Sequence, residues 1–279
     1  MTKWNLIIDV AECTNCNVCT LATQDEYVGN EWPGVAAEMP KHGHRWIDIK
    51  RKERGQPPLV DVAYVPVMCQ HCDDAPCMKA AKNGAVTKRA DGIVIIDPEK
   101  SKGQKQIMEA CPYGVVFWNE EKDIPQAWPF DAHLLDAGWP EPRAATACPT
   151  GAFRALKVDD DEMQRIRAEE GLEELDPDAA TKPRVYYKNL YRYTKCFVAG
   201  SIAGDIDGTE ECISGATVTL LKGGEEISRC ETDAFGDFKI DRLDPDSGGY
   251  TVRIDADNFE TKTADFELGE SITLATIHL

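Results

Sequence analysis

The sequence predicts an α+β fold in two parts, a cysteine-rich part at residues 1–195 and an all-β part at residues 196–279. Two observations lead to this prediction. Eight of the eleven cysteines lie between residues 13 and 148, and six of these form two tight groups. From about residue 197, short runs rich in β-branched residues alternate with turns that contain glycine. A chain of 279 residues is long enough for one large domain or two ordinary ones.

The composition excludes several classes of protein. A formal net charge of −18 and a pI near 4.7 exclude a general positive field that would hold a nucleic-acid backbone or an anionic membrane surface. A hydrophobic content of 42% is too high for a disordered chain. No apolar run approaches the length of a transmembrane helix, and the N-terminal apolar stretch is too short for a signal peptide. The odd number of cysteines, eleven, excludes complete disulfide pairing.

The spacing of eight cysteines is typical of iron–sulfur chemistry. Two groups of three cysteines are closely spaced, and two later cysteines each precede a proline. In chain order the eight are Cys13, Cys16, Cys19, Cys69, Cys72, Cys77, Cys111 and Cys148. A cubane cluster needs four thiolates, and a tight loop can supply three while a distant Cys-Pro supplies the fourth. Two [4Fe–4S] clusters therefore use all eight cysteines.

Other interpretations of the cysteines fit less well. A closed zinc site takes four ligands in two pairs, so the third cysteine of each group has no place in it. A disulfide framework is less favoured still. The remaining cysteines, Cys196, Cys212 and Cys230, have no partner at ligand spacing, and we expect small buried or half-buried residues there.

The pairing of each loop with its Cys-Pro follows from the positions where ligands are missing. In two-cluster ferredoxins, the fourth cysteine of a Cys-x2-Cys-x2-Cys-x3-Cys-Pro run ligates the other cluster. This chain looks like a doubled version of that plan in which eight positions hold other residues: Thr23, Ala81, Ser101, Gln104, Ile107, Trp128, Asp131 and Ala144. Those positions make up two complete ligand sets, so two clusters are wholly lost and two are wholly kept. The kept sets are Cys13, Cys16, Cys19 and Cys148 for cluster 1, and Cys69, Cys72, Cys77 and Cys111 for cluster 2.

Several phrases carry a resemblance to a known family. The stretches at 69–77, 91–98 and 111–114, which include Cys-Gln-His-Cys and Cys-Pro-Tyr-Gly, resemble the ferredoxin-like iron–sulfur subunits of dimethyl-sulfoxide-reductase-type molybdenum enzymes. The stretches at 30–34, 44–46, 118–121, 132–136 and 182–191 further resemble the small subunits of pyrogallol–phloroglucinol transhydroxylases and related anaerobic phenol hydroxylases. That family keeps a further cluster, whereas this chain has Trp128 and Asp131 at ligand positions.

The resemblance implies an electron-transfer subunit. Its partner would be a large catalytic subunit that carries molybdenum or tungsten bis-pyranopterin and acts on hydroxylated aromatics, in a heterodimer or larger assembly. On this chain we expect no active site, no binding of nucleic acid and no membrane insertion. Free thiols and oxygen-sensitive clusters indicate an anaerobic cytoplasm, although a partner's twin-arginine signal could export the folded subunit.

Two alternatives stay open. The chain could be a structural or assembly subunit whose clusters do not relay electrons in turnover, because a transhydroxylation has no net electron demand. It could also be the relay subunit of a respiratory molybdoenzyme.

Local patterns predict the elements of the first part. We expect strands at 4–9 and 93–97 beside the cysteine loops, and a helix at 100–110 that leads into Cys111. The acidic residues at 159–162 suit a helix N-terminus and predict a helix to about residue 175, with Gly171 near its end. The Tyr-rich, basic segment 181–193 is either a strap across the domain or a partner contact. His71 is expected to support cluster 2 without binding it, while His42, His44 and His133 have packing or hydrogen-bonding roles.

The pattern of short β-rich runs in the second part predicts an all-β sandwich or small barrel of seven strands. The expected strands are 197–202, 216–221, 226–231, 236–240, 250–254, 261–267 and 272–277. Their pattern resembles transthyretin-like and Cna-B-like domains. Residues 196–279 hold 18 acidic and 6 basic residues, a net charge of −12. A solvated surface is the simpler explanation of this charge, and an acidic docking face is the alternative.

Overall fold

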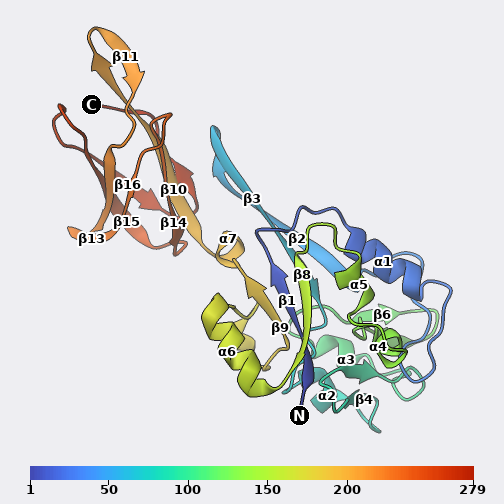
Figure 1. Ribbon diagram of the computed structural model, residues 1–279. Helices are drawn as coiled ribbons and strands as arrows, with labels where there is room; N and C mark the ends of the chain where they lie inside the picture. The colour runs from blue at the N-terminus through green and yellow to red at the C-terminus, as the bar shows by residue number, and fades with distance from the viewer. The chain divides into compact units, whose positions relative to one another are not determined.

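The computed structural model describes residues 1–279, and the chain divides into two compact units (Figure 1). The first unit comprises Met1–Lys50 and Tyr64–Leu190, and the second comprises Arg51–Ala63 and Tyr191–Leu279. A short segment from the first part of the chain thus belongs to the second unit. The single boundary near residue 195 stays a prediction.

A three-stranded sheet forms the centre of the first unit. Its middle strand β1 (Lys3–Asp9) pairs antiparallel with β8 (Phe153–Val158) and parallel with β9 (Val185–Lys188). Consecutive residues of β1 from Trp4 to Ile8 are buried, so both faces of this middle strand are covered. The strand β9 comes from the Tyr-rich segment 181–193, so part of this segment is an edge strand of the sheet. A partner contact by this segment stays a prediction.

Helix α6 (Asp160–Glu170) covers one face of this sheet through a small apolar cluster that includes Ile7, Met163 and Tyr186 (Figure 1). The carboxylate of Asp159 caps the helix by accepting a 2.9 Å hydrogen bond from the backbone N–H of Glu162. The helix starts where the acidic residues predict, and it ends before the predicted residue 175 because Gly171 adopts a left-handed φ of 61°.

Short elements hold the cysteine loops of the first unit. The helices are α1 (Val18–Tyr27), α2 (Pro76–Ala80), α3 (Gln106–Glu109), α4 (Ala132–Asp136), α5 (Arg143–Thr146) and the 3₁₀ turn η1 (Pro177–Ala179). Two small hairpins are β4 (Val86–Lys88) with β5 (Val94–Ile96), and β6 (Phe117–Asn119) with β7 (Ile124–Gln126). The prediction of a helix at 100–110 was wrong in its length, because only α3 is helical within this range. Turns precede α3, and Gly103 has a left-handed φ of 71°.

The second unit is a β-sandwich, which confirms the predicted fold. One sheet has β10 (Cys196–Ile206) at its centre, paired with β11 (Thr209–Cys212), β14 (Asp237–Leu243), β17 (Ile272–Thr273) and β18 (Ile277–His278). The other sheet has the order β13 (Glu225–Glu231), β12 (Thr217–Lys222), β15 (Gly248–Asp255) and β16 (Lys262–Leu268). The short helix α7 (Tyr191–Thr194) precedes β10. Beyond the seven expected strands, β11 is additional and the last strand is divided into β17 and β18.

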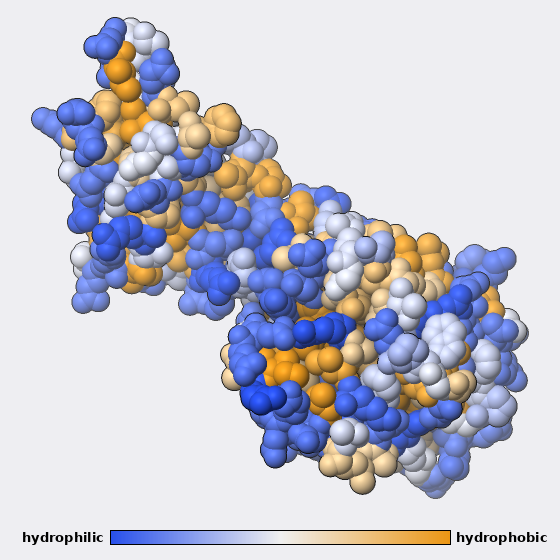
Figure 2. Space-filling model, viewed as in Figure 1, coloured by the Kyte–Doolittle hydropathy of each residue, from blue (hydrophilic) through white to orange (hydrophobic).

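Alternating side chains make the core of the sandwich. Val218 and Leu220 of β12 and Val252 of β15 are fully buried, and Phe238 faces them from the other sheet in the same apolar cluster. Hydrophilic residues cover much of the visible surface of this unit (Figure 2), as its net charge leads us to expect. None of the helices in the chain has the length and apolar composition that crossing a bilayer requires.

A long hairpin, β2 (Ile47–Gln56) and β3 (Leu59–Met68), supplies the extra segment of the second unit. Within that unit, the buried guanidinium of Arg54 forms ion pairs with Asp61 and, at 2.9 Å, with Asp241. The side chain of Gln56 accepts a 3.0 Å hydrogen bond from the backbone N–H of Thr273. A buried cation between two carboxylates is strongly held in place, because removing either partner leaves a charge unpaired.

The sandwich core gives a stability prediction. Leu220→Ala removes a fully buried side chain, and we expect it to destabilise the second unit by about 3 kcal/mol. Amide hydrogen exchange of the peptides that cover β12 and β15 should accelerate about 100-fold. Ile227→Ala is the matched control, because Ile227 is 50% exposed. Equal exchange rates in the two variants would contradict the proposed packing.

Candidate metal centre

The first cysteine loop lies between β1 and α1 and turns sharply at Asn15 and Asn17, which have left-handed φ values of 58° and 59°. Asparagine tolerates this conformation better than most residues. Cys16 is exposed on the loop, and Cys19 is buried in the first turn of α1. Burial raises the pKa of Cys19 to about 11. The loop therefore presents thiols to both the surface and the interior.

Cys148 approaches this loop from the end of α5. Burial raises the pKa of Cys13, and the nearby thiol groups of Cys148 and Cys16 raise it further. At Cys148 itself, burial raises the pKa, but the Thr150 hydroxyl and several backbone N–H groups donate hydrogen bonds to the sulfur and lower the pKa overall. Donors of this kind stabilise a thiolate. The structure thus brings Cys148 to the predicted first set.

The second set lies deeper. Burial raises the pKa of Cys69 well above its usual value, and the neighbouring Cys77, Cys72 and Cys111 raise it further. Burial and the neighbouring thiols Cys111 and Cys72 raise the pKa of Cys77 to about 12. The interactions join all four thiols of the second predicted set, and they include the Cys-Pro residue Cys111.

A charged group supports the second loop from outside. The ammonium of Lys88 donates hydrogen bonds to the carbonyls of His71 (2.7 Å) and Cys72 (2.9 Å), and it pairs with Asp73 at 2.6 Å. The imidazole Nδ1 of His71 accepts a 3.1 Å hydrogen bond from the backbone N–H of Val94. His71 therefore braces the loop against β5, in the supporting role that the sequence predicts.

The donor chemistry of both sets fits a [4Fe–4S] cluster. All eleven cysteines are free thiols, so none of these eight is committed to a disulfide. Thiols buried together resist ionisation, and a bound metal centre is what stabilises the thiolate form. The thiols of neither set converge on the position of a single ion, as a zinc site would require. Four spaced thiols can instead each bind one iron of a cubane.

Other side chains fill the positions of the first missing set. Thr23, Trp128, Asp131 and Ala144 each have an exposed fraction of 3% or less. The Asp131 carboxylate accepts hydrogen bonds from Tyr27 and Trp128, at 2.8 and 2.9 Å. The Trp128 ring packs against Phe130, with the ring centroids 5.0 Å apart. A polar hydrogen-bonded core occupies this region.

The second missing set holds two apolar residues, Ala81 and Ile107, and two polar ones, Gln104 and the fully buried Ser101. Ile107 is fully buried in a cluster with Ala85, Val86 and Val94, and Ala81 packs against it. Gln104 accepts a 2.8 Å hydrogen bond from the backbone N–H of Lys82 through its side-chain oxygen. Both missing sets therefore lie in packed interior.

The remaining histidines have ordinary roles. His44 Nε2 lies 3.0 Å from the carbonyl of Trp118, and His133 Nε2 lies 2.8 Å from Glu26. His42 is exposed. His133 also stacks on Trp32, with ring centroids 4.0 Å apart.

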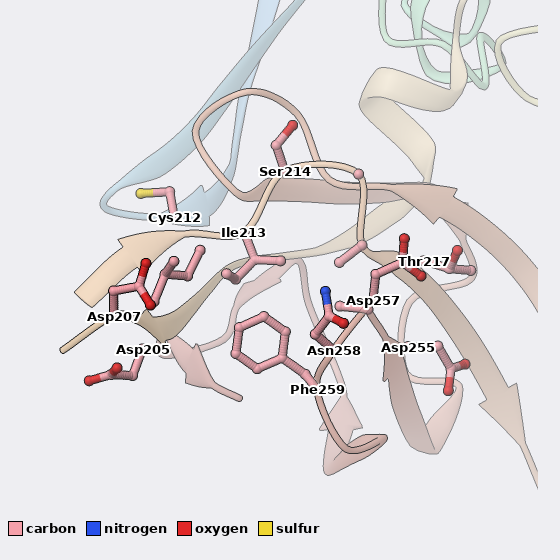
Figure 3. Close-up of a pocket in the computed structure, with 14 residues that line it drawn as sticks. Asp205, Asp207, Cys212, Ile213, Ser214, Thr217, Asp255, Asp257, Asn258 and Phe259 are labelled. Atoms are coloured by element: carbon pink, nitrogen blue, oxygen red, sulfur yellow. The ribbon is translucent and has the colours of Figure 1, made fainter. Parts of the chain in front are cut away.

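A hollow of about 700 Å³ lies in the second unit, between the β10–β11 turn and the loop after β15 (Figure 3). Asp205, Asp207, Asp255 and Asp257 line it, and Phe259 lies among them. Two of these carboxylates already have partners, since Asp205 accepts from the backbone N–H of Gly208 and Asp255 pairs with Arg253. The hollow contains none of the predicted cluster ligands.

Comparison with known proteins agrees with this geometry. The 4Fe-4S dicluster domain family matches residues 60–158, and the carboxypeptidase regulatory-like domain family matches residues 201–279. The chain is 48% identical over 260 residues to the pyrogallol hydroxytransferase small subunit of Pelobacter acidigallici, covering 92% of each chain. This chain belongs to the family of that small subunit. Further relatives are named as iron–sulfur or electron-transfer subunits of reductases.

Two such relatives are more distant. A putative iron–sulfur subunit of dimethyl sulfoxide reductase from Halobacterium salinarum is 30% identical over 68% of this chain and 80% of its own. The arsenate respiratory reductase iron–sulfur subunit of a Shewanella species is 27% identical over 66% of this chain and 95% of its own. Among solved structures, Klebsiella pneumoniae 5-hydroxyisourate hydrolase is 21% identical over 30% of this chain and 90% of its own, with a TM-score of 0.25, too weak a similarity to support an argument.

Sequence reasoning did not find all the residues that support the loops of this iron–sulfur subunit. Lys88 and Thr150 were missed because a lone lysine or threonine carries no metal-ligand signal. For Thr150, its place two residues after Cys148 was the available clue.

The two thiol sets give a prediction about cluster loss. In the purified chain we expect about eight irons, and alanine at Cys13 or Cys148 should remove one set of electron paramagnetic resonance signals and about four irons. Alanine at Cys69 or Cys111 should remove the other set. The exposed Cys212 provides the control, since Cys212→Ala should keep all the iron. If Cys148→Ala and Cys111→Ala removed the same signals, the pairing would be wrong.

Proposed function

We propose that this chain carries two [4Fe–4S] clusters and exchanges electrons with a catalytic subunit that holds molybdenum or tungsten bis-pyranopterin. Cluster 1 would bind Cys13, Cys16, Cys19 and Cys148, and cluster 2 would bind Cys69, Cys72, Cys77 and Cys111. The observation that carries the proposal is the convergence of each three-cysteine loop with one distant Cys-Pro thiol. When bound, the clusters supply one-electron redox chemistry, and the protein positions and solvates them.

The chain's own residues tune the two clusters differently. Cys16 is exposed and Cys148 receives several hydrogen bonds, whereas every thiol of the second set is buried or half-buried. Hydrogen bonds to sulfur and exposure to solvent favour the more negatively charged, reduced state and so raise a cluster's potential. We therefore assign the higher potential to cluster 1.

The exposed edge of cluster 1 suggests where electrons enter or leave. A hollow of about 680 Å³ adjoins the first cysteine loop and includes Lys41, His42 and Arg45 in its lining. The guanidinium of Arg45 also donates a 2.6 Å hydrogen bond to Asn17 in the loop. Cationic side chains here, in a chain of net charge −18, suit an acidic partner surface.

The substrate class and the compartment complete the proposal. The relative at 48% identity is named as a pyrogallol hydroxytransferase subunit, which supports a partner acting on hydroxylated aromatics. Thiols and oxygen-sensitive clusters suit an anaerobic cytoplasm. We place no active site on this chain. Its proposed partner is a separate large subunit.

A second candidate function is structural. The missing clusters are replaced by packed side chains around Trp128 and Ile107, which could interrupt a longer relay. In that case the clusters would hold the fold and the interface, and the complex would turn over without redox cycling. A relay in a respiratory enzyme is the third candidate, and the similarity to an arsenate respiratory reductase subunit favours it.

Rapid freezing of the assembled complex distinguishes a relay from the structural function. The complex is purified anaerobically from its source, and its iron, molybdenum and tungsten contents are measured. Substrate is then added, and electron paramagnetic resonance spectra are recorded within one turnover. The relay predicts that the cluster signals change at a rate no slower than turnover. Unchanged signals throughout steady-state turnover, with a no-substrate sample as control, would overturn the relay in favour of the structural function.

A further inference from the structure

Asp131 is a buried residue whose side-chain carboxylate accepts three hydrogen bonds. Its Oδ1 accepts from the Tyr27 hydroxyl at 2.8 Å and from the Trp128 indole N–H at 2.9 Å. Its Oδ2 accepts from the backbone N–H of Arg143 at 2.9 Å. An ionised carboxylate only accepts hydrogen bonds, so three donors and no competing acceptor match it well. Asp131 is thus the centre of a small polar network in the interior.

Two of the three partners of Asp131 lie on helices that are next to ligands of cluster 1, and the third, Trp128, lies in the loop before α4. Tyr27 is the last residue of α1, and Cys19 lies near the start of the same helix. Arg143 is the first residue of α5, and Cys148 follows that helix with its N–H bonded to the Ala145 carbonyl at 3.1 Å. A shift of either short helix therefore moves a ligand thiol.

A second layer of contacts ties the same elements together. The Arg143 guanidinium donates a 2.6 Å hydrogen bond to Glu26 and also pairs with Asp25. Glu26 in turn lies 2.8 Å from His133 of α4. These contacts are closer to the surface than Asp131, and they leave Asp131 as the fully enclosed link between α1 and α5.

The backbone at Asp131 has an unusual conformation that the surrounding packing holds in place. Phe130 and Asp131 are consecutive left-handed residues, with φ values of 57° and 50°. That conformation is rare for an aromatic residue, and it persists where packing enforces it. Phe130 packs against Trp128 and, with ring centroids 5.2 Å apart, against His71 of the second cysteine loop.

We propose that Asp131 is a positioning residue for cluster 1, which replaces with hydrogen bonds the cross-link that a lost cluster would have provided between α1, α5 and the loop before α4. By holding α1 and α5 together, it sets the separation of the Cys19 and Cys148 thiols. The inference rests on the proposed function, because it requires cluster 1 to bind at these thiols.

The test compares Asp131→Asn with Asp136→Asn in the full chain. The amide at position 131 places an N–H₂ group where one of the donors now points, whereas Asp136 is an exposed partner of Arg89. We expect Asp131→Asn to release iron from cluster 1 to a chelator about tenfold faster and to shift the potential of cluster 1. The signals of cluster 2 should stay unchanged, and Asp136→Asn should behave like the parent chain. The signals of cluster 1 are those that Cys148→Ala removes.

Tyr27→Phe is the milder variant if Asp131→Asn fails to fold, because it removes one hydroxyl donor and keeps the ring. It should accelerate the release of iron from cluster 1 by about threefold, a smaller effect than that of Asp131→Asn and of the same sign. Release rates and potentials equal to those of the parent in both variants would overturn the inference, as would equal acceleration at both clusters. A parent chain that holds no iron would instead refute the proposed function.

Discussion

The fold of the first unit depends on gathering eight thiols in two sets, each of which joins a tight loop to a distant Cys-Pro. All of these thiols except the exposed Cys16 are buried or half-buried. This constraint explains why the surrounding elements are so short. A helix such as α5 needs only one turn to deliver Cys148, and the left-handed Asn15 and Asn17 let the first loop curl. Burial raises the pKa of most of these thiols, so the arrangement is costly for thiolates alone. A metal centre bound at each proposed set would compensate for this cost.

The missing ligand positions show two ways of closing a lost metal site. Around Ile107 an apolar cluster fills the interior, and Gln104 makes local hydrogen bonds at its edge, while Ser101 of the same set is fully buried. Around Asp131 the interior has stayed polar, with a carboxylate that accepts from three donors. The Asp131 region lies between α1, which contains Cys19, and α5, which Cys148 follows. The Ile107 region lies between α2, which contains Cys77, and α3, which Cys111 follows, so directional hydrogen bonds fill one lost position beside ligand thiols and side-chain packing fills the other.

The sequence predicted the parts of this structure that obey a chemical or periodic rule. The strand β12 follows from alternation around Val218 and Leu220, and the two ligand sets stay a prediction from the cysteine spacing. The hairpin tip at Arg54 was missed because its polar residues form a buried ion-pair network with Asp61 and Asp241, which no local pattern reveals. The network at Asp131 was also missed. A residue at a ligand position shows that the ligand is gone, whereas its replacement contacts come from segments far apart in the chain.

The central claim is that two clusters remain and that both missing sites are filled by protein. Anomalous diffraction at the iron absorption edge, from anaerobic crystals of the chain or its complex, tests this claim most directly. We predict two iron peaks in this chain, one among Cys13, Cys16, Cys19 and Cys148 and one among Cys69, Cys72, Cys77 and Cys111. An iron peak beside Trp128 or Ile107, or a peak that joins thiols from both sets, would contradict the account.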